Sequence, residues 1–381
     1  MSGACSRRSF LGASGAALAI GSLGAGSLRA AGADASTGLD WLARKKGLRF
    51  GSAVDPRDLT DPALAQLLEA ECSVLVGENA FKWKVLEPQA RRYNFGPADQ
   101  IYDWTVARGK ALRGHTFVWN QDNRIPEWIA RVEEEPAALR VAVLETLMRE
   151  HIENVMGRYP AITSWDVVNE MIQLGDGSIR SSVWSRALGE RIMDSAFAIA
   201  RETDPKCQLV YNDYMSWGTK PDHRDGVLRL LESSLGRGVP IDALGIQGHL
   251  ATTLGKEIDI PEWRRFLDEV QGMGLKVLIT ELDCADAFVA SSDPRVRDQA
   301  AAEHVKEFLD VTLSYENVTE ILLWDLTDSD SYVRSKRYEE KRGREDKLPM
   351  RAHPFDENLQ RKPMYGAIAA ALRSAPKRKV S

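Results

Sequence analysis

The order of hydrophobic and polar positions divides most of this 381-residue chain into alternating short and long segments. The short segments are apolar and rich in β-branched residues, as buried strands are. The long ones space their apolar residues three or four apart, as helices do. We expect strands at 48–54, 72–77, 110–119, 164–170, 208–211, 243–247, 276–281 and 320–324.

The segments between these strands carry helix signals at their ends. Asp61 can cap a helix that begins at Pro62, and Gly109 suits the end of the helix that opens at Gly96-Pro97. Further helices are expected at 136–159, 183–203, 221–235, from 261 onward, 293–315 and 362–374. Eight strand–helix units without a break predict an α/β protein with a single (β/α)₈ barrel, a TIM barrel. A doubly wound open sheet is the alternative, although eight regular units favour closure.

Two of the expected strands end in glutamates. The apolar run from Ser164 ends in Asn169-Glu170, and the run from Lys276 ends in Glu281-Leu282-Asp283. The carboxyl ends of parallel strands meet at the face of a barrel where ligands bind. Two carboxyl groups at that face suit glycoside hydrolysis, one as acid and the other as nucleophile or base. Either glutamate alone would be explained equally well as a solvated loop cap.

Most other expected strand ends also carry polar or aromatic side chains. A loop cap or a hydrogen-bonded core histidine would explain any single one of them. Together they predict a ring of hydrogen-bonding groups with aromatic walls, as in a cleft that binds carbohydrate. These residues are Glu78, Asn79, Lys82, His115, Trp119, Asn212, Asp213, Tyr214, Gln247, His249 and Trp324.

Composition and cysteine spacing narrow the choice of partners. An apolar content of 44% supports a large core, and a net charge of −5 gives no reason to expect binding to nucleic acid or an anionic membrane. After removal of the first residues, Cys72, Cys207 and Cys284 remain, each in or beside an apolar run. Their odd number and position predict free buried thiols. Because the sequence has neither a CxxC nor a His-x-x-x-His spacing, we expect no metal site and no cofactor.

Residues 1–33 have the pattern of an export signal. Residues 6–11 form a twin-arginine signature, an Ala-, Gly- and Leu-rich stretch follows, and Ala31 and Ala33 fit a cleavage site. The stretch is too rich in Gly and Ser to be a good membrane span. We expect the twin-arginine export machinery to carry the protein to the periplasm or beyond, with residues 34–381 as the mature catalytic domain. At the other end, residues 377–379 are expected to be frayed and solvated.

Several motifs of the chain resemble those of the family 10 glycoside hydrolases, the endo-β-1,4-xylanases. The matching segments occur in the family's order and, with Trp324 and Lys362-Pro363, extend from about Gly51 to Ala370. They are Glu78-Asn79-Ala80-Phe81-Lys82-Trp83, Arg113-Gly114-His115-Thr116-Phe117-Val118-Trp119, Trp165-Asp166-Val167-Val168-Asn169-Glu170, Asn212-Asp213-Tyr214, Gly245-Ile246-Gln247-Gly248-His249 and Thr280-Glu281-Leu282-Asp283.

The resemblance implies an endo-acting hydrolase of xylan or xylo-oligosaccharides that retains the configuration at the anomeric carbon. Glu170 would be the acid/base and Glu281 the nucleophile, which requires carboxyl groups roughly 5–5.5 Å apart. Asn169 would bind the sugar 2-OH and His249 would contact the nucleophile, while Asp283 would either orient His249 or cap its loop. The remaining residues expected to bind substrate are Glu78, Asn79, Lys82, His115, Trp119, Tyr214, Gln247, Trp324 and Tyr332. We expect the enzyme to act as a monomer.

Three positions depart from the family pattern. Tyr332 stands where the family has a second Trp eight positions after Trp324, Asp325 replaces a small residue, and Asn120 replaces a His before a lengthened segment at 121–125. Both glutamates and their partners are present, so we expect these changes to affect the roof of the cleft and the preference for chain length. The reaction type should be unaffected.

Other interpretations of the sequence remain open. The same machinery would also serve another β-linked glycan or an aryl glycoside. A catalytically silent carbohydrate-binding barrel should have lost one of the two carboxylates, and a metal-dependent hydrolase using His115, His249 and Asp283 lacks ligand spacing. The irregular stretch at 325–361 follows the last strand, so it is expected on the catalytic face, as a lid or as a solvated segment.

Overall fold

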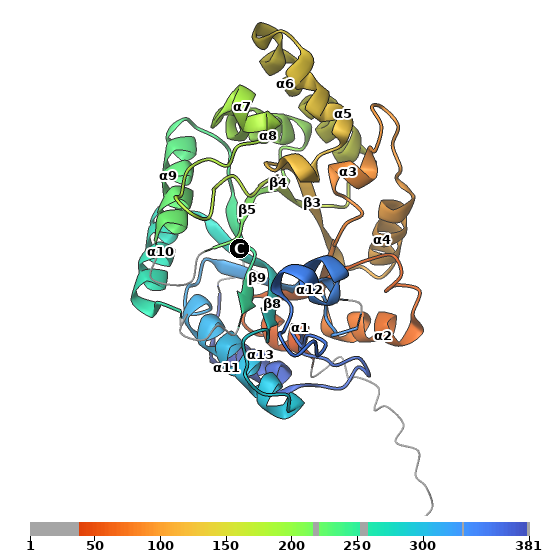
Figure 1. Ribbon diagram of the computed structural model, residues 1–381, viewed down its shortest axis with the longest axis vertical. Helices are drawn as coiled ribbons and strands as arrows, with labels where there is room; N and C mark the ends of the chain where they lie inside the picture. The colour runs from red at the N-terminus through yellow and green to blue at the C-terminus, as the bar shows by residue number, and fades with distance from the viewer. Residues whose placement is uncertain (1–37, 216–220, 252–257, 330, 379–381) are drawn as a thin grey trace, which may run out of the picture. The chain divides into compact units, whose positions relative to one another are not determined.

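The computed structural model describes residues 38–215, 221–251, 258–329 and 331–378. Parallel strands surround a central axis, and the helices form an outer ring (Figure 1). The predicted export signal, residues 1–33, lies outside the described residues. The strands are β1 (Arg49–Val54), β2 (Val74–Gly77), β3 (Ala111–Trp119), β4 (Ser164–Asn169), β5 (Gln208–Asp213), β6 (Ala243–Ile246), β7 (His249–Ala251), β8 (Lys276–Ala285) and β9 (Val318–Leu323).

The sheet is a closed barrel of eight parallel strands. Each strand from β1 to β5 pairs with the next, so that the series ends at β6; β9 joins β1 to β8, and β8 pairs with β6 to complete the circle. The predicted (β/α)₈ barrel is therefore confirmed, and the open sheet is wrong. The sequence interpretation missed β7, which pairs His249 with Asp283 beyond the end of β6. Gly248 makes the bend between β6 and β7 with φ +80°, a conformation that favours glycine.

The helices occupy nearly all the predicted segments. The predicted helix at 183–203 is instead two helices, because Gly189 adopts φ +58° and ends the first of them. No helix of the described ranges is long and apolar enough to cross a membrane. The helices are α1 (Leu39–Arg44), α2 (Pro62–Glu71), α3 (Trp83–Leu86), α4 (Gly96–Ala107), α5 (Glu127–Ala130), α6 (Ala137–Arg158), α7 (Val183–Leu188), α8 (Arg191–Thr203), α9 (Asp222–Gly236), α10 (Ile260–Gly272), α11 (Pro294–Thr312), α12 (Lys336–Arg342) and α13 (Pro363–Ser374), with 3-10 turns η1 (Asp122–Arg124), η2 (Arg131–Glu134) and η3 (Tyr332–Arg334).

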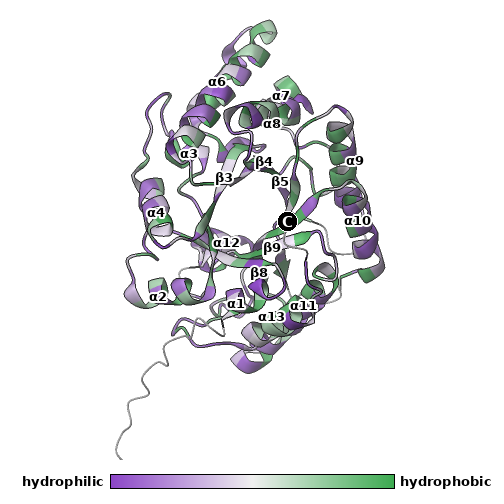
Figure 2. Ribbon diagram, turned by 180° about the vertical axis from the view of Figure 1, so that it is seen from behind, coloured by the Kyte–Doolittle hydropathy of each residue, from purple (hydrophilic) through white to green (hydrophobic). Residues whose placement is uncertain are grey.

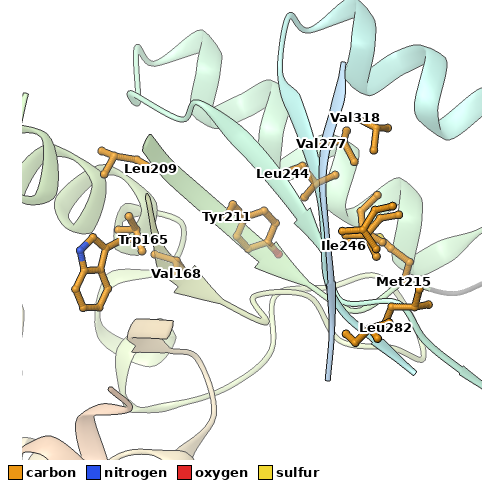
Figure 3. Packing of buried hydrophobic residues seen from close by; sticks show 14 of the residues in the cluster. Trp165, Val168, Leu209, Tyr211, Met215, Leu244, Ile246, Val277, Leu282 and Val318 are labelled. Atoms are coloured by element: carbon orange, nitrogen blue, oxygen red, sulfur yellow. The ribbon is translucent and has the colours of Figure 1, made fainter. Parts of the chain in front are cut away.

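The main core lies between the strands and the ring of helices. The helices carry both apolar and polar residues (Figure 2), and side chains such as Leu209, Tyr211 and Leu244 are buried on the strands (Figure 3). Trp165 stacks on Phe117 with ring centroids 4.2 Å apart. A Cβ at residue 114 would lie 1.9 Å from the Trp165 ring, so only glycine permits this packing. The predicted burial of Cys72, Cys207 and Cys284 is confirmed.

Charged side chains also occupy the interior of the barrel. Arg113 on β3 is 1% exposed and donates to Asp166 Oδ1 of β4 at 2.5 Å. Its Nε lies 3.3 Å from Glu320 Oε1 of β9. An unpaired buried charge is costly, so each of these groups is tolerated in the interior only together with its oppositely charged partner. This network joins the strands that carry the polar residues at the carboxyl ends.

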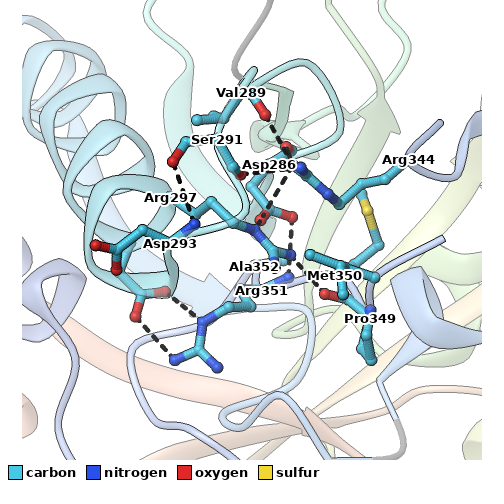
Figure 4. A network of polar contacts seen from close by, with 12 residues as sticks. Asp286, Val289, Ser291, Asp293, Arg297, Arg344, Pro349, Met350, Arg351 and Ala352 are labelled. Carbon is cyan, nitrogen blue, oxygen red and sulfur yellow. Dashed lines mark hydrogen bonds and ion pairs between the residues drawn. The ribbon is translucent and has the colours of Figure 1, made fainter. Parts of the chain in front are cut away.

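The stretch at 325–361 is anchored on the barrel by buried ion pairs (Figure 4). Arg344, 4% exposed, donates to the backbone oxygens of Asp286, Val289 and Ser291 at 2.8–3.0 Å. Arg351 Nε donates to Asp298 Oδ1 of α11 at 2.8 Å. Within the stretch, α12 has no buried residue, which agrees with the solvated segment that was one of the two expectations. These contacts favour a fixed wall over a lid.

The predicted solvated end at 377–379 is wrong for Arg378, which is 7% exposed. Its guanidinium donates to the backbone oxygens of Val318 at 3.0 Å and Leu313 at 2.8 Å. Carbonyl groups at the end of α11 lack helical partners, and a cation there is favourable. Tertiary packing thus buries Arg378, although the sequence around it is typical of a disordered end.

Candidate active site

Of the two predicted catalytic glutamates, one follows the carboxyl end of β4 and the other lies within β8, which extends four residues beyond it. Glu170 follows β4 with φ +56°, and its backbone N–H donates to Asn212 O of β5 at 2.9 Å. Glu281 lies within β8, and its N–H donates to Gln247 O at 2.8 Å. A non-glycine residue with positive φ persists only where its surroundings hold it, and such residues are frequent at functional sites.

A chain of hydrogen bonds connects the two carboxyl groups across the barrel. Gln247 Nε2 lies 3.2 Å from Glu170 Oε1 and 3.4 Å from Asn169 Oδ1. Asn212 Nδ2 continues the chain, because it donates to Asn169 Oδ1 at 3.0 Å and to Glu281 Oε1 at 2.8 Å. The network therefore places Glu170, Asn169 and Glu281 in one site, with amide groups fixing both acids.

The Asn169 amide can be placed in two orientations. In the reversed one, its oxygen would accept from Trp119 Nε1 at 3.2 Å and its nitrogen would donate to Asn212 O at 3.1 Å, but that nitrogen would also lie 3.0 Å from Asn212 Nδ2. We favour the orientation in which Asn169 Oδ1 faces Asn212 Nδ2, because Asn212 Oδ1 already accepts from the Thr280 hydroxyl at 2.7 Å. Asn212 must then present its nitrogen to Asn169, which requires an acceptor there.

His249 lies between two carboxylates. Its Nε2 is 3.0 Å from Glu281 Oε2 and its Nδ1 is 2.8 Å from Asp283 Oδ2. Burial alone would lower the pKa of His249, but Asp283 and Glu281 outweigh it and raise the pKa well above its usual value. Burial likewise opposes the charge of Glu281, yet His249, His115 and Lys82 together lower the pKa of this carboxyl. Glu281 is thus held as an anion, the form that a nucleophile requires.

Sequence reasoning missed the closest charged neighbour of Glu170, which is Arg180 in the loop between β4 and α7. Arg180 Nη1 donates to Glu170 Oε2 at 2.9 Å, and Nη2 donates to the Tyr214 hydroxyl. The Tyr214 hydroxyl donates in turn to Ile172 O at 3.0 Å. The only sequence signal for Arg180 is its position ten residues after Glu170 in a Gly- and Ser-containing loop, and this does not give a side-chain direction.

Predicted sugar-binding groups also surround a partly buried lysine. Lys82 Nζ donates to Asn79 Oδ1 at 3.0 Å and lies 5.2 and 5.5 Å from the ring centroids of Trp119 and Trp324. His115 contacts Trp324 edge-on with centroids 5.5 Å apart, and its Nδ1 lies 2.9 Å from Asp166 Oδ2. The two tryptophans and the lysine therefore meet as the sequence predicted.

Glu78 and Asn79 face Tyr332 across an open cavity of about 440 Å³. Ser331, Arg334 and Arg57 also line it. Burial, and next the charge of Asp55, raise the pKa of Glu78 to about 7, so Glu78 keeps its proton in weak acid. The volume lies in the range of ligand sites, and the lining is rich in groups that bond hydroxyls.

The metal-dependent alternative finds no support in the geometry. Within the ranges that the structure describes, no three His, Cys, Asp or Glu side chains are arranged to hold a metal ion. The nitrogens of His249 contact Asp283 and Glu281, and Nδ1 of His115 contacts Asp166. His249 is thus the one of the three that contacts a catalytic carboxyl, while Asp283 and His115 are paired with His249 and Asp166.

Comparison with known proteins identifies relatives over most of the chain. Residues 38–371 match the sequence model described as "Glycosyl hydrolase family 10". "Endo-1,4-beta-xylanase 3" of Hypocrea jecorina is 30% identical over 340 residues, 89% of this chain and 86% of the relative. "Exoglucanase XynX" of Acetivibrio thermocellus is 30% identical over 339 residues, 86% of this chain and 29% of the relative. The crystal structure of xylanase 10B from Thermotoga petrophila in complex with xylobiose matches with a TM-score of 0.76 and 28% identity, covering 88% of this chain and 97% of that chain.

Proposed function

The chain belongs to glycosyl hydrolase family 10, and from this premise we propose that it is a retaining endo-β-1,4-xylanase. The observation that carries the proposal is the hydrogen-bonded chain from Glu170 through Gln247, Asn169 and Asn212 to Glu281. Two carboxyl groups fixed in one cleft are what glycoside hydrolysis requires, and the retaining course by double displacement is the one that the resemblance to the family implies. The xylanase names of relatives and the xylobiose in a similar structure support xylan as the substrate.

In the first step, Glu281 attacks the anomeric carbon of the sugar at the cleavage point. The bond to the leaving sugar breaks, its oxygen takes the proton of Glu170, and a glycosyl–Glu281 ester forms. The lowered pKa of Glu281 keeps the nucleophile anionic. Asn169 donates to or accepts from the sugar 2-OH, and Lys82 and His115 bind other hydroxyls of the same sugar.

In the second step, Glu170 acts as the base. Its carboxylate removes a proton from water while the water oxygen attacks the anomeric carbon, and the bonding electrons return to Glu281. Two inversions at the same carbon give net retention. Glu170 ends protonated and is ready for the next first step.

The remaining predicted residues would bind the neighbouring sugars. Trp119 and Trp324 supply flat apolar faces, which suit the faces of sugar rings. Glu78, Asn79 and Tyr332 line the 440 Å³ cavity, where the next sugar of the bound chain would lie. Gln247 and Tyr214 complete the set around Glu170, and Asp283 supports the orientation of His249.

We propose in addition that residues 1–33 direct export by the twin-arginine route. A change of Arg7 and Arg8 to Lys in the full chain should retain active enzyme in the cytoplasm, whereas the unchanged chain should yield it in the periplasm or medium. Equal distribution of both forms would refute this.

The substrate is tested by product analysis on unbranched xylan and on a soluble cellulose derivative. The second polymer is included because one relative is named an exoglucanase. We expect short β-xylo-oligosaccharides from xylan alone, activity lost in Glu281→Ala, and activity unchanged in Glu340→Ala, which removes an exposed carboxylate from α12. Untouched xylan, or full activity of Glu281→Ala, would contradict the proposal.

Azide separates the roles of the two glutamates. On a dinitrophenyl β-xylobioside, which needs no acid, Glu170→Ala should give the β-glycosyl azide, because azide attacks the ester on Glu281. In Glu281→Ala, azide attacks the substrate directly and should give the α-glycosyl azide. Reversed configurations would exchange the two assignments.

A further inference from the structure

Arg180 contacts the acid/base without having a role in the mechanism above. Its side chain is 14% exposed and lies 2.9 Å from a Glu170 carboxyl that is 13% exposed. Burial alone lowers the pKa of Arg180, but Tyr214, Glu170 and Asp213 outweigh it, so the pKa is raised and the guanidinium remains charged. A partly buried cation on the acid/base must affect the two steps differently, since Glu170 is neutral in one and anionic in the other.

The contacts of Glu170 suit its anionic form. Oε1 accepts from Gln247 Nε2 and Oε2 accepts from Arg180 Nη1. Arginine has only donors, so a proton on Oε2 would meet a donor and have no acceptor there. The structure therefore shows the arrangement that the second step needs, with Glu170 ready to remove a proton from water.

The loop around Arg180 is built to hold this position. Asn120 Nδ2 donates to Arg180 O at 2.8 Å, and the Ser185 hydroxyl donates to the same oxygen at 2.7 Å. Asn120, one of the departures from the family pattern, also accepts from the Ser182 hydroxyl at the start of α7. The Tyr214 hydroxyl binds the second Nη of Arg180. When Glu170 is protonated in the first step, the Tyr214 hydroxyl still accepts from Arg180 Nη2 and keeps the guanidinium in position.

We propose that Arg180 is a positioning residue for the second step, which holds the Glu170 carboxylate in the orientation that removes a proton from the water attacking the glycosyl-enzyme. This inference rests on the double displacement proposed above and assigns to Arg180 a part in only one of its steps. It predicts that loss of the cation slows hydrolysis of the glycosyl-enzyme more than its formation. Arg180 itself touches no reacting atom and forms no bond to the sugar.

Dinitrophenyl β-xylobioside separates the two steps. Its leaving group needs no proton, so the burst of dinitrophenolate measures formation of the glycosyl-enzyme and the steady rate measures its hydrolysis. In Arg180→Gln we expect an unchanged burst rate and a steady rate lower by about tenfold to a hundredfold, a fraction of what a general base contributes. KM should fall with the steady rate, because the glycosyl-enzyme accumulates.

Three comparisons make the test specific. Azide needs no base, so it should restore the turnover of Arg180→Gln and give the β-glycosyl azide. Arg180→Lys keeps the charge and should recover part of the rate. Arg229→Gln is the matched control, because Arg229 donates to Gly177 O of the same loop at 3.1 Å and does not contact Glu170. Its burst and steady rates should equal those of the unchanged enzyme.

An unchanged steady rate in Arg180→Gln, or an equal loss in burst and steady rates, would overturn the proposal. If Arg180→Gln does not fold, Tyr214→Phe carries the test, since it removes only the hydroxyl that holds the second Nη. It should lower the steady rate about threefold more than the burst rate, and an equal loss in both rates would also count against the proposal. A first-formed α-anomer from the unchanged enzyme would instead refute the double displacement.

Discussion

Glu78→Gln should change how the stability of the protein depends on pH. Glu78 is 8% exposed, and its pKa is raised from 4.5 to about 7 by burial and by Asp55. The folded protein therefore binds a proton that the unfolded chain releases above about pH 4.5. Stability from this group is complete in acid and falls as the pH rises through 7. At about 1.36 kcal/mol per pH unit, the difference between the two pKa values corresponds to about 3 kcal/mol.

Glutamine keeps the donor that a protonated glutamate offers to Asp55 but does not ionise. We expect Glu78→Gln and the unchanged protein to have similar free energies of unfolding near pH 4.5. At pH 8.5 the variant should be more stable by up to about 3 kcal/mol. Urea unfolding across this pH range measures both. Glu340→Gln, on the exposed side of α12, is the control and should follow the unchanged protein. A constant difference between Glu78→Gln and the unchanged protein at all pH values would refute the reasoning.

Two further predictions concern His249 and Arg344. His249→Ala removes a group that lowers the pKa of Glu281, so the acidic limb of kcat/KM on xylan should move to higher pH, and an unmoved limb would exclude this influence. Arg344→Met leaves three backbone oxygens without their buried donor, while Asp286 keeps its ion pair with Arg297, and it should lower the free energy of unfolding by about 3 kcal/mol, roughly 1 kcal/mol for each unsatisfied acceptor. Urea unfolding checks this, and a loss below about 1 kcal/mol would show that the anchor of the 325–361 stretch lies elsewhere.

The barrel and the position of both glutamates could be predicted because their signals are local. An apolar run that stops at a polar residue marks a strand end, and parallel strand ends meet at one face. The contact of His249 with Glu281 was expected from the resemblance to family 10, and the contact with Asp283 was one of two roles left open for that residue. The cysteines were placed correctly from their apolar surroundings alone.

Contacts that depend on loop geometry could not be predicted from the pattern of hydrophobic and polar positions. Arg180 reaches Glu170 through a loop whose course no periodicity determines, and Arg378 is buried only because the end of α11 lies beside it. Local conformation also overrode periodicity at Gly189, where a continuous helical pattern contains a positive φ. The short strand β7 follows the bend at Gly248 and carries too few residues for a recognisable alternation.

The configuration of the first sugar released from xylo-oligosaccharides tests the central claim most directly. NMR taken during the first turnovers, before mutarotation, distinguishes the anomers of the new reducing end. Double displacement through Glu281 and Glu170 predicts the β-anomer first, with the α-anomer appearing only as solution equilibrium is reached. If the α-anomer forms first, the reaction is a single displacement, and neither the nucleophile assigned to Glu281 nor the second step assigned to Glu170 and Arg180 stands.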